Sequence, residues 1–462
     1  MDSAREKNTD TGTLARHLRG PVFTAGTEGY DRERTGYQLL APHRPATIVG
    51  AVETRDVCVA VRFAAATGAR VAVQASGHGL GGALSGGVLI STRRMNGVAV
   101  NPDAGTAWVE AGATWQQVID AAAPHGLAPL SGSSPGVGAV SYTLGGGAGL
   151  LARRHGFAAD HVRRLDVVTA DGELRHVTAD SDPDLFWALR GGGGNFGVVT
   201  GMEIGLVQLT AIYGGGLSFD VERVPDVLEA WRQWTATVPD ELTSAVAMLP
   251  FPDLPMVPRA LRGRHVAQIQ ISYAGPPEQA AGLVRPLREL GQPLRDTLRE
   301  LPYTDSGSVF DEPDRPHGYR SANRLLSELD PDALATLPKL AGPSAPVMCV
   351  AGLRHLGGAL ARAPRVPNAV GHREAAFSLT VLSPVEPGEE DAVRAAHRTV
   401  LDPWTRWTLG RSLNFTFGPS SEQEVRAAFT PADFSRLSEI RAEHDPQGLF
   451  LSNHVLPPGP AH

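Results

Sequence analysis

The segment from Gln74 to Gly79 holds the side chain whose type and setting most favour chemistry. It reads Gln-Ala-Ser-Gly-His-Gly, so His78 stands between two glycines. Glycine carries no Cβ and lets a backbone come close to a ligand. A neutral imidazole can serve as a nucleophile, a base or a metal ligand. No H-x-E or H-x-x-x-H spacing surrounds His78, which disfavours a metal site. A histidine on a tight turn is the structural alternative.

Two glycine-rich stretches follow, at 132–149 and 190–197. Such backbone can turn several N–H groups inward and form a nest suited to pyrophosphate. The glycines at 145, 147 and 149 do not match the G-x-G-x-x-G fingerprint of dinucleotide-binding folds, and no strand leads tightly into them with an acidic residue about twenty residues on. The chain also has no G-x-x-x-x-G-K-[ST] P-loop. Each stretch alone is typical of a turn. Together with the glycine-flanked His78 they favour a nucleotide-type cofactor.

Local patterns predict the elements that would position these segments. We expect a helix over 56–66 stopped by Gly68, then a strand over 70–74 that runs into the His78 loop. Hairpin signals predict paired strands around 101–103 and around Asp171-Gly172. Further predictions are listed by range: a helix from a Thr114/Gln117 capping box to about 123; a helix over 184–190; strands over 265–273, 346–352 and 375–382; helices over 224–234, 278–290 and 422–442.

Bulk properties exclude several classes of protein. The 462 residues are too many for one comfortable core and predict two domains or one large insertion. A net charge of −7 gives no reason to expect nucleic acid or an anionic membrane as partner. No apolar run is long enough for a membrane span, and Met1–Arg19 lacks the apolar stretch of a secretory signal. Two distant cysteines, Cys58 and Cys349, favour reduced thiols over a disulfide, and so a cytoplasmic protein.

The order of these segments resembles the FAD-linked oxidases of the vanillyl-alcohol oxidase superfamily, which have a PCMH-type FAD-binding domain. Within it, the chain is most similar to the berberine-bridge-enzyme-like and 6-hydroxy-D-nicotine-oxidase-like branch. The segments that carry the resemblance are Ser76-Gly77-His78, Arg94-Met95-Asn96, 166–172, 183–200 and a closing D-P-x-x-L-F-x-x-N over 445–453.

The resemblance implies an α+β fold and three stretches of chain. Residues 1–207 would form the PCMH-type FAD-binding domain, and 411–462 would complete it. Residues 208–410 would form a substrate domain with a largely antiparallel sheet flanked by helices. A parallel sheet is the alternative that alternating strands and helices leave open.

The resemblance also implies FAD bound covalently through His78, whose imidazole would bond to the 8α-methyl carbon of the flavin. Many members add a link from the cysteine of Gly-x-Cys-Pro, but Ser134 stands at that place here, so a single link is expected. Val137 matches a position that is small where dioxygen reaches the flavin. The residues expected to hold the cofactor are His78, Ala75, Ser76, Gly77, Gly79, Ser134, Pro135, Val137, Gly138, Ser141, Gly145, Gly146, Gly149, Val198 and Asn453.

The catalytic base does not carry over from the family. Its Tyr-x-Asn-Tyr motif reads Ser412-Leu413-Asn414-Phe415 here, so both tyrosines are missing. We expect Asn414, Tyr142 and His372 to be the catalytic candidates. Tyr273 and His355 are alternatives with weaker support.

The predicted activity is two-electron oxidation of a small organic substrate, with hydride transfer to flavin N5 and reoxidation by dioxygen. A dehydrogenase, or an oxygenating enzyme that tailors a natural product, is the alternative on the same scaffold. A flavin-binding module without turnover and a non-flavin binder of carbohydrate or nucleotide are further alternatives. We expect no metal, and the sequence does not decide the oligomeric state.

Overall fold

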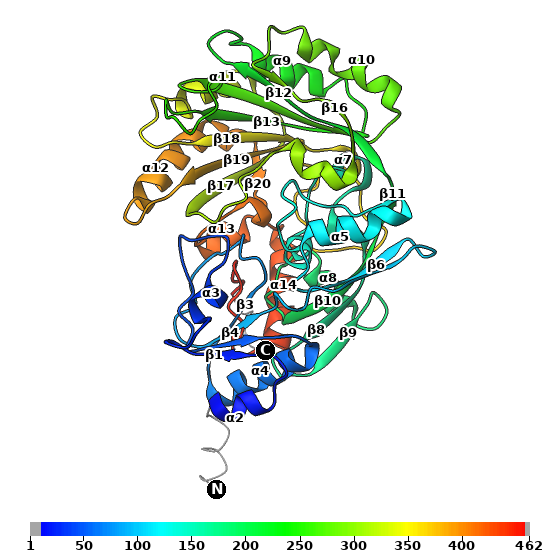
Figure 1. The fold of residues 1–462 in the computed structure, drawn as a ribbon, viewed down its shortest axis with the longest axis vertical. Helices are drawn as coiled ribbons and strands as arrows, with labels where there is room; N and C mark the ends of the chain where they lie inside the picture. The colour runs from blue at the N-terminus through cyan, green and yellow to red at the C-terminus, as the bar shows by residue number, and fades with distance from the viewer. Residues whose placement is uncertain (1–10, 458–462) are drawn as a thin grey trace.

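The computed structural model describes residues 11–457, and four β-sheets organise this part of the chain. Figure 1 shows the four-stranded and five-stranded sheets in the lower half of the molecule and the largest sheet in the upper half. Of the polar start predicted at Met1–Arg19, residues 1–10 lie outside the described residues. No helix among residues 11–457 is long and apolar enough to cross a membrane. Cys58 and Cys349 are both free.

The first sheet contains the strand that leads into the His78 loop. Its strand order is β1-β2-β4-β3, with parallel pairing of β4 to both β2 and β3. The helix α4 crosses over from β2 to β3 and ends at Gly68, whose backbone is left-handed. The prediction of this helix and of the following strand is confirmed. The bounds are β1 Val22–Phe23, β2 Thr47–Gly50, α4 Thr54–Thr67, β3 Val71–Gln74 and β4 Val88–Ser91, with α2 Thr11–Arg16 and α3 Tyr30–Arg34 beside them.

The second sheet is antiparallel and has the order β5-β6-β10-β8-β9. Both predicted hairpins are confirmed: Asp171-Gly172 joins β8 to β9, and Gly172 adopts a φ of 75°. The capping box of Thr114 and Gln117 starts α5 as predicted. The bounds are β5 Val98–Asn101, β6 Thr106–Glu110, α5 Trp115–Ala122, α6 Ala139–Leu144, α7 Ala152–His155, β8 Val162–Val168, β9 Leu174–Val177, α8 Pro183–Leu189 and β10 Val198–Gly205.

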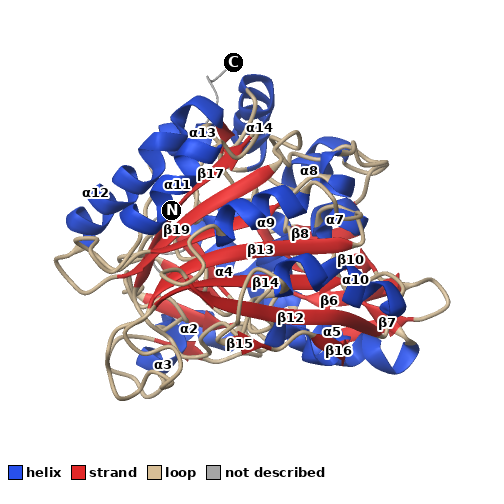
Figure 2. Ribbon diagram, turned by 90° about the horizontal axis from the view of Figure 1, so that it is seen from above, coloured by secondary structure: helices blue, strands red, loops and turns tan. Residues whose placement is uncertain are grey.

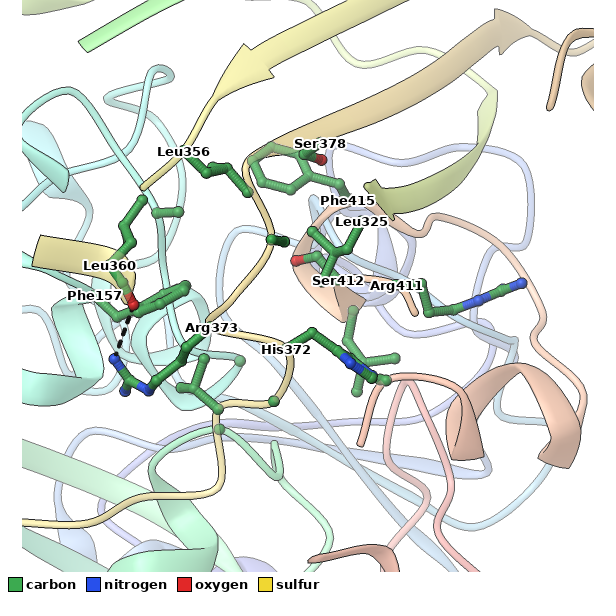
Figure 3. Close-up of a pocket in the computed structure, with 18 of the residues that line it drawn as sticks. Phe157, Leu325, Leu356, Leu360, His372, Arg373, Ser378, Arg411, Ser412 and Phe415 are labelled. Carbon is green, nitrogen blue, oxygen red and sulfur yellow. Dashed lines mark hydrogen bonds between the residues drawn. The ribbon is translucent and has the colours of Figure 1, made fainter. Parts of the chain in front are cut away.

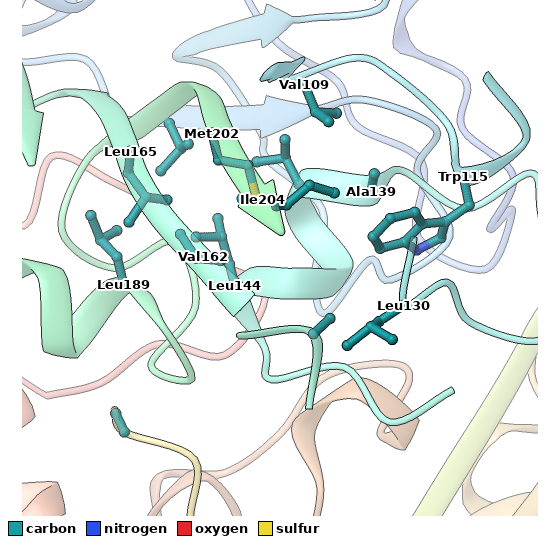
Figure 4. Close-up of a cluster of buried hydrophobic side chains, with 14 of the residues drawn as sticks. Val109, Trp115, Leu130, Ala139, Leu144, Val162, Leu165, Leu189, Met202 and Ile204 are labelled. Carbon is teal, nitrogen blue, oxygen red and sulfur yellow. The ribbon is translucent and has the colours of Figure 1, made fainter. Parts of the chain in front are cut away.

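A hydrophobic core lies between this second sheet and its helices (Figure 4). Trp115 is 1% exposed and is one of the largest side chains in it. Leu144, the last residue of α6, packs in this core, and the glycines that follow it lie at the edge of the core. A two-stranded sheet, β7 (Leu127–Ala128) with β11 (Val207–Gln208), stands at its edge.

The largest sheet is antiparallel throughout, so the predicted sheet type is confirmed and the parallel alternative is wrong. Within the described residues it has nine strands, in the order β15-β12-β14-β13-β18-β19-β17-β20, with β16 paired to β12. Figure 2 shows β12, β13 and β14 running side by side. The bounds are β12 Ala211–Asp220, β13 Leu242–Pro250, β14 His265–Tyr273, β15 Arg295–Asp296, β16 Arg299–Pro302, β17 Tyr319–Leu326, β18 Val350–His355, β19 Phe377–Pro384 and β20 Thr408–Gly410.

The two faces of this sheet differ in chemistry because side chains alternate along each strand. One face carries apolar residues such as Val246, Ile271 and Leu353, which pack under the helices. The other face carries Ser272 and Arg354 at the intervening positions. The helices on the apolar side are α9 Val227–Thr235, α10 Pro277–Arg288, α11 Pro331–Leu340 and α12 Glu390–Leu401.

Two predicted elements differ most from the observed bounds. The strand expected over 346–352 begins only at Val350, because Pro346 cannot donate to a sheet ladder. The single helix expected over 422–442 is two helices, α13 (Glu422–Arg426) and α14 (Pro431–His444). Thr430 caps the second with its hydroxyl, and a proline occupies its first turn, where no N–H is needed. Helix α14 then returns to pack beside α8 (Figure 1).

Candidate flavin and substrate site

The His78 loop is fixed by a neighbouring strand-like segment. The N–H groups of Tyr37 and Gln38 donate to the carbonyls of Ser76 and Gly77, at 3.0 Å each. Gly77 has a φ of +74°, and a Cβ there would lie 2.6 Å from Gly36 Cα. Only glycine tolerates both conditions. The loop after β3 is therefore held in one shape.

The imidazole of His78 is oriented and neutral. Its Nδ1 lies 2.9 Å from Ser76 Oγ, and its ring stacks on Tyr37 with centroids 3.9 Å apart. Tyr319 donates its hydroxyl to the His78 carbonyl at 2.5 Å. Burial, together with the nearby His317, lowers the pKa of His78 to about 4. Its Nε2 has no hydrogen-bond partner among residues 11–457. A neutral, oriented imidazole has the properties of a nucleophile.

Ser76 joins the His78 loop to the second glycine-rich stretch. The N–H of Gly138 donates to Ser76 Oγ at 3.2 Å. A Cβ on Gly138 would lie 3.5 Å from Ala75 Cβ, so the two loops are in contact. Ser141, in the first turn of α6, donates its hydroxyl to the Gly138 carbonyl at 3.2 Å. The structure thus brings these predicted cofactor residues together.

The stretch from Gly132 to Gly138 is anchored on α5. The N–H groups of Trp115 and Gln116 donate to the carbonyls of Val137 (3.0 Å) and Pro135 (2.9 Å). The Ser134 hydroxyl makes no hydrogen bond to any other residue in the described chain. Ser134 and Val137 are both half-buried. Their side chains are available to a bound group.

The second and third glycine-rich stretches also meet. The Leu144 carbonyl accepts from the N–H groups of Gly191 (2.9 Å) and Gly193 (3.0 Å). Asn414 donates its amide to the Tyr142 carbonyl at 2.9 Å. A Cβ on Gly145 would lie 1.9 Å from Asn414 Oδ1, so the C-terminal segment packs directly on this loop. Gly146 and Gly149 belong to the same loop and have no side chain of their own.

The C-terminal tail closes the cradle. Asn453 accepts from the N–H of Gly81 at 3.3 Å, and its amide nitrogen lies 3.7 Å from where a Cβ of Gly79 would be. The side chain of Asn195, in the third glycine-rich stretch, donates to the His454 carbonyl at 3.0 Å. Segments far apart in the sequence therefore meet around the His78 loop.

A cavity of about 640 Å³ lies between these loops and the large sheet (Figure 3). Its walls are largely apolar, with His372, Arg373 and Arg411 as the charged or ionisable side chains. The lining residues labelled in Figure 3 are Phe157, Leu325, Leu356, Leu360, His372, Arg373, Ser378, Arg411, Ser412 and Phe415.

His372 is held in the wall of this cavity by an unusual backbone. Its φ is 53°, in the left-handed region that glycine favours. The Nε2–H donates to the Ala427 carbonyl at 3.1 Å, which leaves the lone pair of the neutral ring on Nδ1. The Nδ1 atom lies 3.7 Å from Glu374 Oε1. His372 therefore lines the cavity with Nε2 occupied by a backbone carbonyl and Nδ1 as its remaining ring nitrogen.

Two predicted residues lie away from the cavity. Tyr142 packs its ring edge-on against Trp115 at 5.5 Å, and its buried hydroxyl has no hydrogen-bond partner among residues 11–457. Burial raises the pKa of Tyr142, which makes it a poor base. Val198 is 1% exposed and packs in the core beside α4.

The two weaker base candidates have structural roles. Arg153 donates to Nε2 of His355 at 2.9 Å, and burial beside Arg153 lowers the pKa of His355 to about 3. Tyr273 is 2% exposed among the apolar residues under the helices, and its hydroxyl donates to Gln279 at 3.3 Å. Neither reaches the 640 Å³ cavity, which does not include them in its walls.

Sequence reasoning missed Tyr37, Tyr319 and Arg354. Tyr37 and Tyr319 contact His78 from distant segments, and Arg354 points from β18 toward the Ser134 loop. No motif marks them. Strand alternation identifies Arg354 as a residue of the polar face once the face is known.

The residues present fit a flavin nucleotide. The loops that meet at His78 are rich in glycine, so much of their backbone is not covered by side chains. The His78 ring beside them is neutral and has one nitrogen without a hydrogen bond. No cluster of three or more histidine, cysteine or acidic side chains that could hold a metal occurs among residues 11–457. His78 and the glycine-rich loops therefore suit an uncharged ring and a pyrophosphate bound by backbone N–H groups.

Comparison with known proteins also indicates an FAD-binding protein. The family model described as an FAD binding domain matches residues 45–178. The chain is 25% identical over 457 residues to the uncharacterized FAD-linked oxidoreductase YgaK of Bacillus subtilis, covering 96% of this chain and 97% of that protein. It is 32% identical over 194 residues to the (R)-6-hydroxynicotine oxidase of Paenarthrobacter nicotinovorans, covering 42% of each.

A solved structure resembles the chain over nearly its whole length. It is that of 6-hydroxy-D-nicotine oxidase from Arthrobacter nicotinovorans, with a TM-score of 0.81 and 22% sequence identity. The match covers 95% of this chain and 98% of that one. At this identity the likeness establishes the α+β fold, with its antiparallel sheet.

Proposed function

We propose that this chain, which belongs to the FAD-linked oxidoreductases of the vanillyl-alcohol oxidase superfamily, is an oxidase that holds FAD by one covalent bond to His78. The observation that carries the proposal is the neutral His78 imidazole, held by Ser76 and Tyr37 where the glycine-rich loops meet. A cationic imidazole could not attack the flavin, whereas this one keeps a lone pair at neutral pH.

The residues that would hold FAD come from all parts of the cradle. When bound, the flavin supplies two-electron redox chemistry that no amino-acid side chain offers. In this proposal residues 1–207 and 411–462 bind the cofactor, and 208–410 cover the substrate. The loop residues proposed to contact the cofactor are Ala75, Ser76, Gly77, His78, Gly79, Ser134, Pro135, Val137, Gly138, Ser141, Gly145, Gly146, Gly149 and Asn453, and Val198 would act only through the core beneath them.

Ser134 makes the link single. A serine hydroxyl cannot replace the cysteine thiolate that gives many relatives their second bond. Half-buried Ser134 is free to contact the ring but adds no covalent anchor. Val137, with its short side chain, would leave room for dioxygen.

His372 is the side chain we propose as the base. Its side chain lines the 640 Å³ cavity, and its Nε2–H is bonded to the Ala427 carbonyl, which leaves Nδ1 as the atom that could take a proton. Asn414 would position the loop at Gly145 rather than move a proton, because its amide bonds a backbone carbonyl. In the overall reaction a small organic substrate loses two electrons and two protons, and dioxygen takes them up as hydrogen peroxide.

Acid precipitation of the purified protein tests the covalent bond. We expect a yellow pellet from the native chain and a colourless pellet from His78→Ala. His125→Ala, at a histidine after α5, is the matched control and should stay yellow. A native flavin that washes into the supernatant would refute the bond to His78. Mass spectra of flavin-bearing peptides should contain one linked peptide, and a second one would refute the single link.

Oxygen consumption tests the reaction class. An oxidase bleaches its flavin with substrate under anaerobic conditions and forms one peroxide per substrate in air. A dehydrogenase bleaches but forms little peroxide with air. An oxygenating enzyme consumes dioxygen without matching peroxide, and a binding module bleaches with no compound in the screen. Peroxide formation therefore separates the proposed activity from each alternative.

We also propose that the enzyme acts in the cytoplasm on a small molecule, without nucleic acid or membrane partners. Two free cysteines and the acidic net charge of −7 support this. Cell fractionation is the test, and recovery with secreted or membrane material would contradict it.

A further inference from the structure

A second cavity, of about 360 Å³, lies between the flavin loop and the polar face of the large sheet. Three neighbouring strands of the sheet form one wall of this cavity. Ser272 on β14 pairs with Thr243 on β13, and Arg354 on β18 pairs with Ala245 on β13. The residues that line it are Ala148, Gly149, Leu150, Ala152, Thr243, Ser244, Ser272, Phe310, Arg354, His355, Leu356 and Leu360. Ala148, Leu356 and Leu360 also line the 640 Å³ cavity, so the two cavities adjoin.

Arg354 is the positive charge of this second cavity. Its guanidinium carbon lies 4.6 Å from the Phe310 ring centroid and 4.8 Å from that of Phe415. Its Nη2 donates to Ser133 Oγ at 3.2 Å. Ser133 neighbours Ser134, and Phe415 neighbours Asn414, which bonds the loop at Tyr142. Arg354 therefore touches both segments that the proposed function sets against the flavin.

The guanidinium makes no ion pair with any carboxylate among residues 11–457. Glu312 is the acidic group that acts on it, but that exposed carboxylate accepts instead from the Ser133 hydroxyl at 2.7 Å. Burial lowers the pKa of Arg354 without removing its charge. A desolvated cation without an anion is costly, and an anion that enters the cavity would offset that cost.

A second donor stands on the same face. Ser272 is 2% exposed, and its buried hydroxyl has no hydrogen-bond partner among residues 11–457. Buried hydroxyls normally have partners, so the Ser272 hydroxyl is free to donate to a polar group that enters this cavity. Arg354 offers several N–H groups in one plane, which matches the two oxygens of a carboxylate.

We propose that Arg354 and Ser272 select a substrate that carries a carboxylate, and that Phe310 and Phe415 flank the group attached to it. This inference rests on the proposed function, because it assigns the cavity to the substrate of the flavin site. The carboxylate sets which molecules enter, and proton transfer remains with His372.

Calorimetric titration of the holoenzyme with benzoate and with benzamide tests the proposal without turnover. The two probes have nearly the same shape but differ in charge. We expect benzoate to bind at least about tenfold more tightly, which corresponds to about 1.4 kcal/mol. Arg354→Gln should abolish the preference, Arg354→Lys should keep part of it, and Ser272→Ala should weaken benzoate alone.

Arg324→Gln is the matched control, since Arg324 pairs with Leu379 of the helix-covered face of the same sheet. That variant removes one positive charge and should keep the preference. Equal binding of both probes, binding of neither, or a preference that survives in Arg354→Gln would each overturn the inference. If Arg354→Gln does not fold, the lysine and Ser272→Ala variants decide the outcome. A yellow acid pellet with no benzoate preference would refute this inference and leave the proposed function standing.

Discussion

Replacement of Ser76 by alanine should slow covalent attachment of FAD. The Ser76 hydroxyl lies 2.9 Å from His78 Nδ1 and accepts from the Gly138 N–H at 3.2 Å. A neutral hydrogen bond contributes about 1 kcal/mol net, and a barrier higher by about that much slows a reaction about fivefold. Loss of the His78 contact alone therefore predicts a rate of attachment lowered about fivefold.

The same variant should also lose stability. Gly138 is buried, so its N–H would be left without a partner at a cost of about 1–3 kcal/mol. Together with the lost bond to His78, the free energy of unfolding should fall by about 2–4 kcal/mol. Chemical denaturation of the apoprotein measures this quantity, and acid-stable flavin fluorescence after addition of FAD measures attachment.

Thr399→Ala is the control for both measurements. The exposed Thr399 hydroxyl donates to the Ala395 carbonyl in its own turn of α12, away from the residues proposed to contact FAD. We expect attachment in this variant to proceed at the native rate. An unchanged rate in Ser76→Ala, or an equally slow rate in Thr399→Ala, would refute the role assigned to the Ser76 hydroxyl.

Three further changes have defined outcomes. Because burial lowers the pKa of His78 to about 4, below the ordinary 6.5, its imidazole stays neutral in mild acid. The rate of FAD attachment should therefore stay level from about pH 8 to about pH 5 and fall only below that, and a rate that halves near pH 6.5 would contradict this. Gly145→Ala should cost about 2–3 kcal/mol of unfolding free energy through its clash with Asn414. Asn414→Ala should relieve part of that cost in a double-mutant cycle by denaturation, and strictly additive effects would exclude the clash. Val137→Ile should slow reoxidation by dioxygen about tenfold and leave anaerobic bleaching by substrate unchanged; stopped-flow absorbance separates the two, and equal slowing of both would argue against a passage for dioxygen.

Local sequence patterns predicted most elements in the first half of the chain. The turns and helix caps that bound those elements depend on residues close together in the sequence. The turn at Asp171-Gly172 and the cap at Thr114 depend on residues within four positions of one another. The split between α13 and α14 had a signal of the same kind, since Thr430-Pro431 begins a helix as a cap and a first-turn proline. The amphipathic run over 422–442 masked that signal.

The cofactor side of the site was predictable for a similar reason. Glycines that flank a histidine are a local feature, and they marked the His78 loop. The substrate side was not predictable, because Arg354 meets Ser133 only when a strand of the large sheet is set against the flavin loop. The stack of Tyr37 on His78 likewise joins residues 41 positions apart in sequence, as their numbers give. Such contacts depend on tertiary pairing, and a single sequence does not encode them in any short pattern.

The closure of the cradle by residues 449–456 has a consequence for the order of events in the cell. Val71, at the start of the strand that leads to His78, pairs with Phe450, and the backbone of Leu456 bonds to Asn195. A ribosome makes those late residues after every other part of the site. The earlier loops can fold as they emerge, but FAD meets a complete cradle only once residues 449–456 have emerged and docked. Attachment of the flavin would then report that synthesis has passed this segment, so a product truncated before residue 449 would remain colourless.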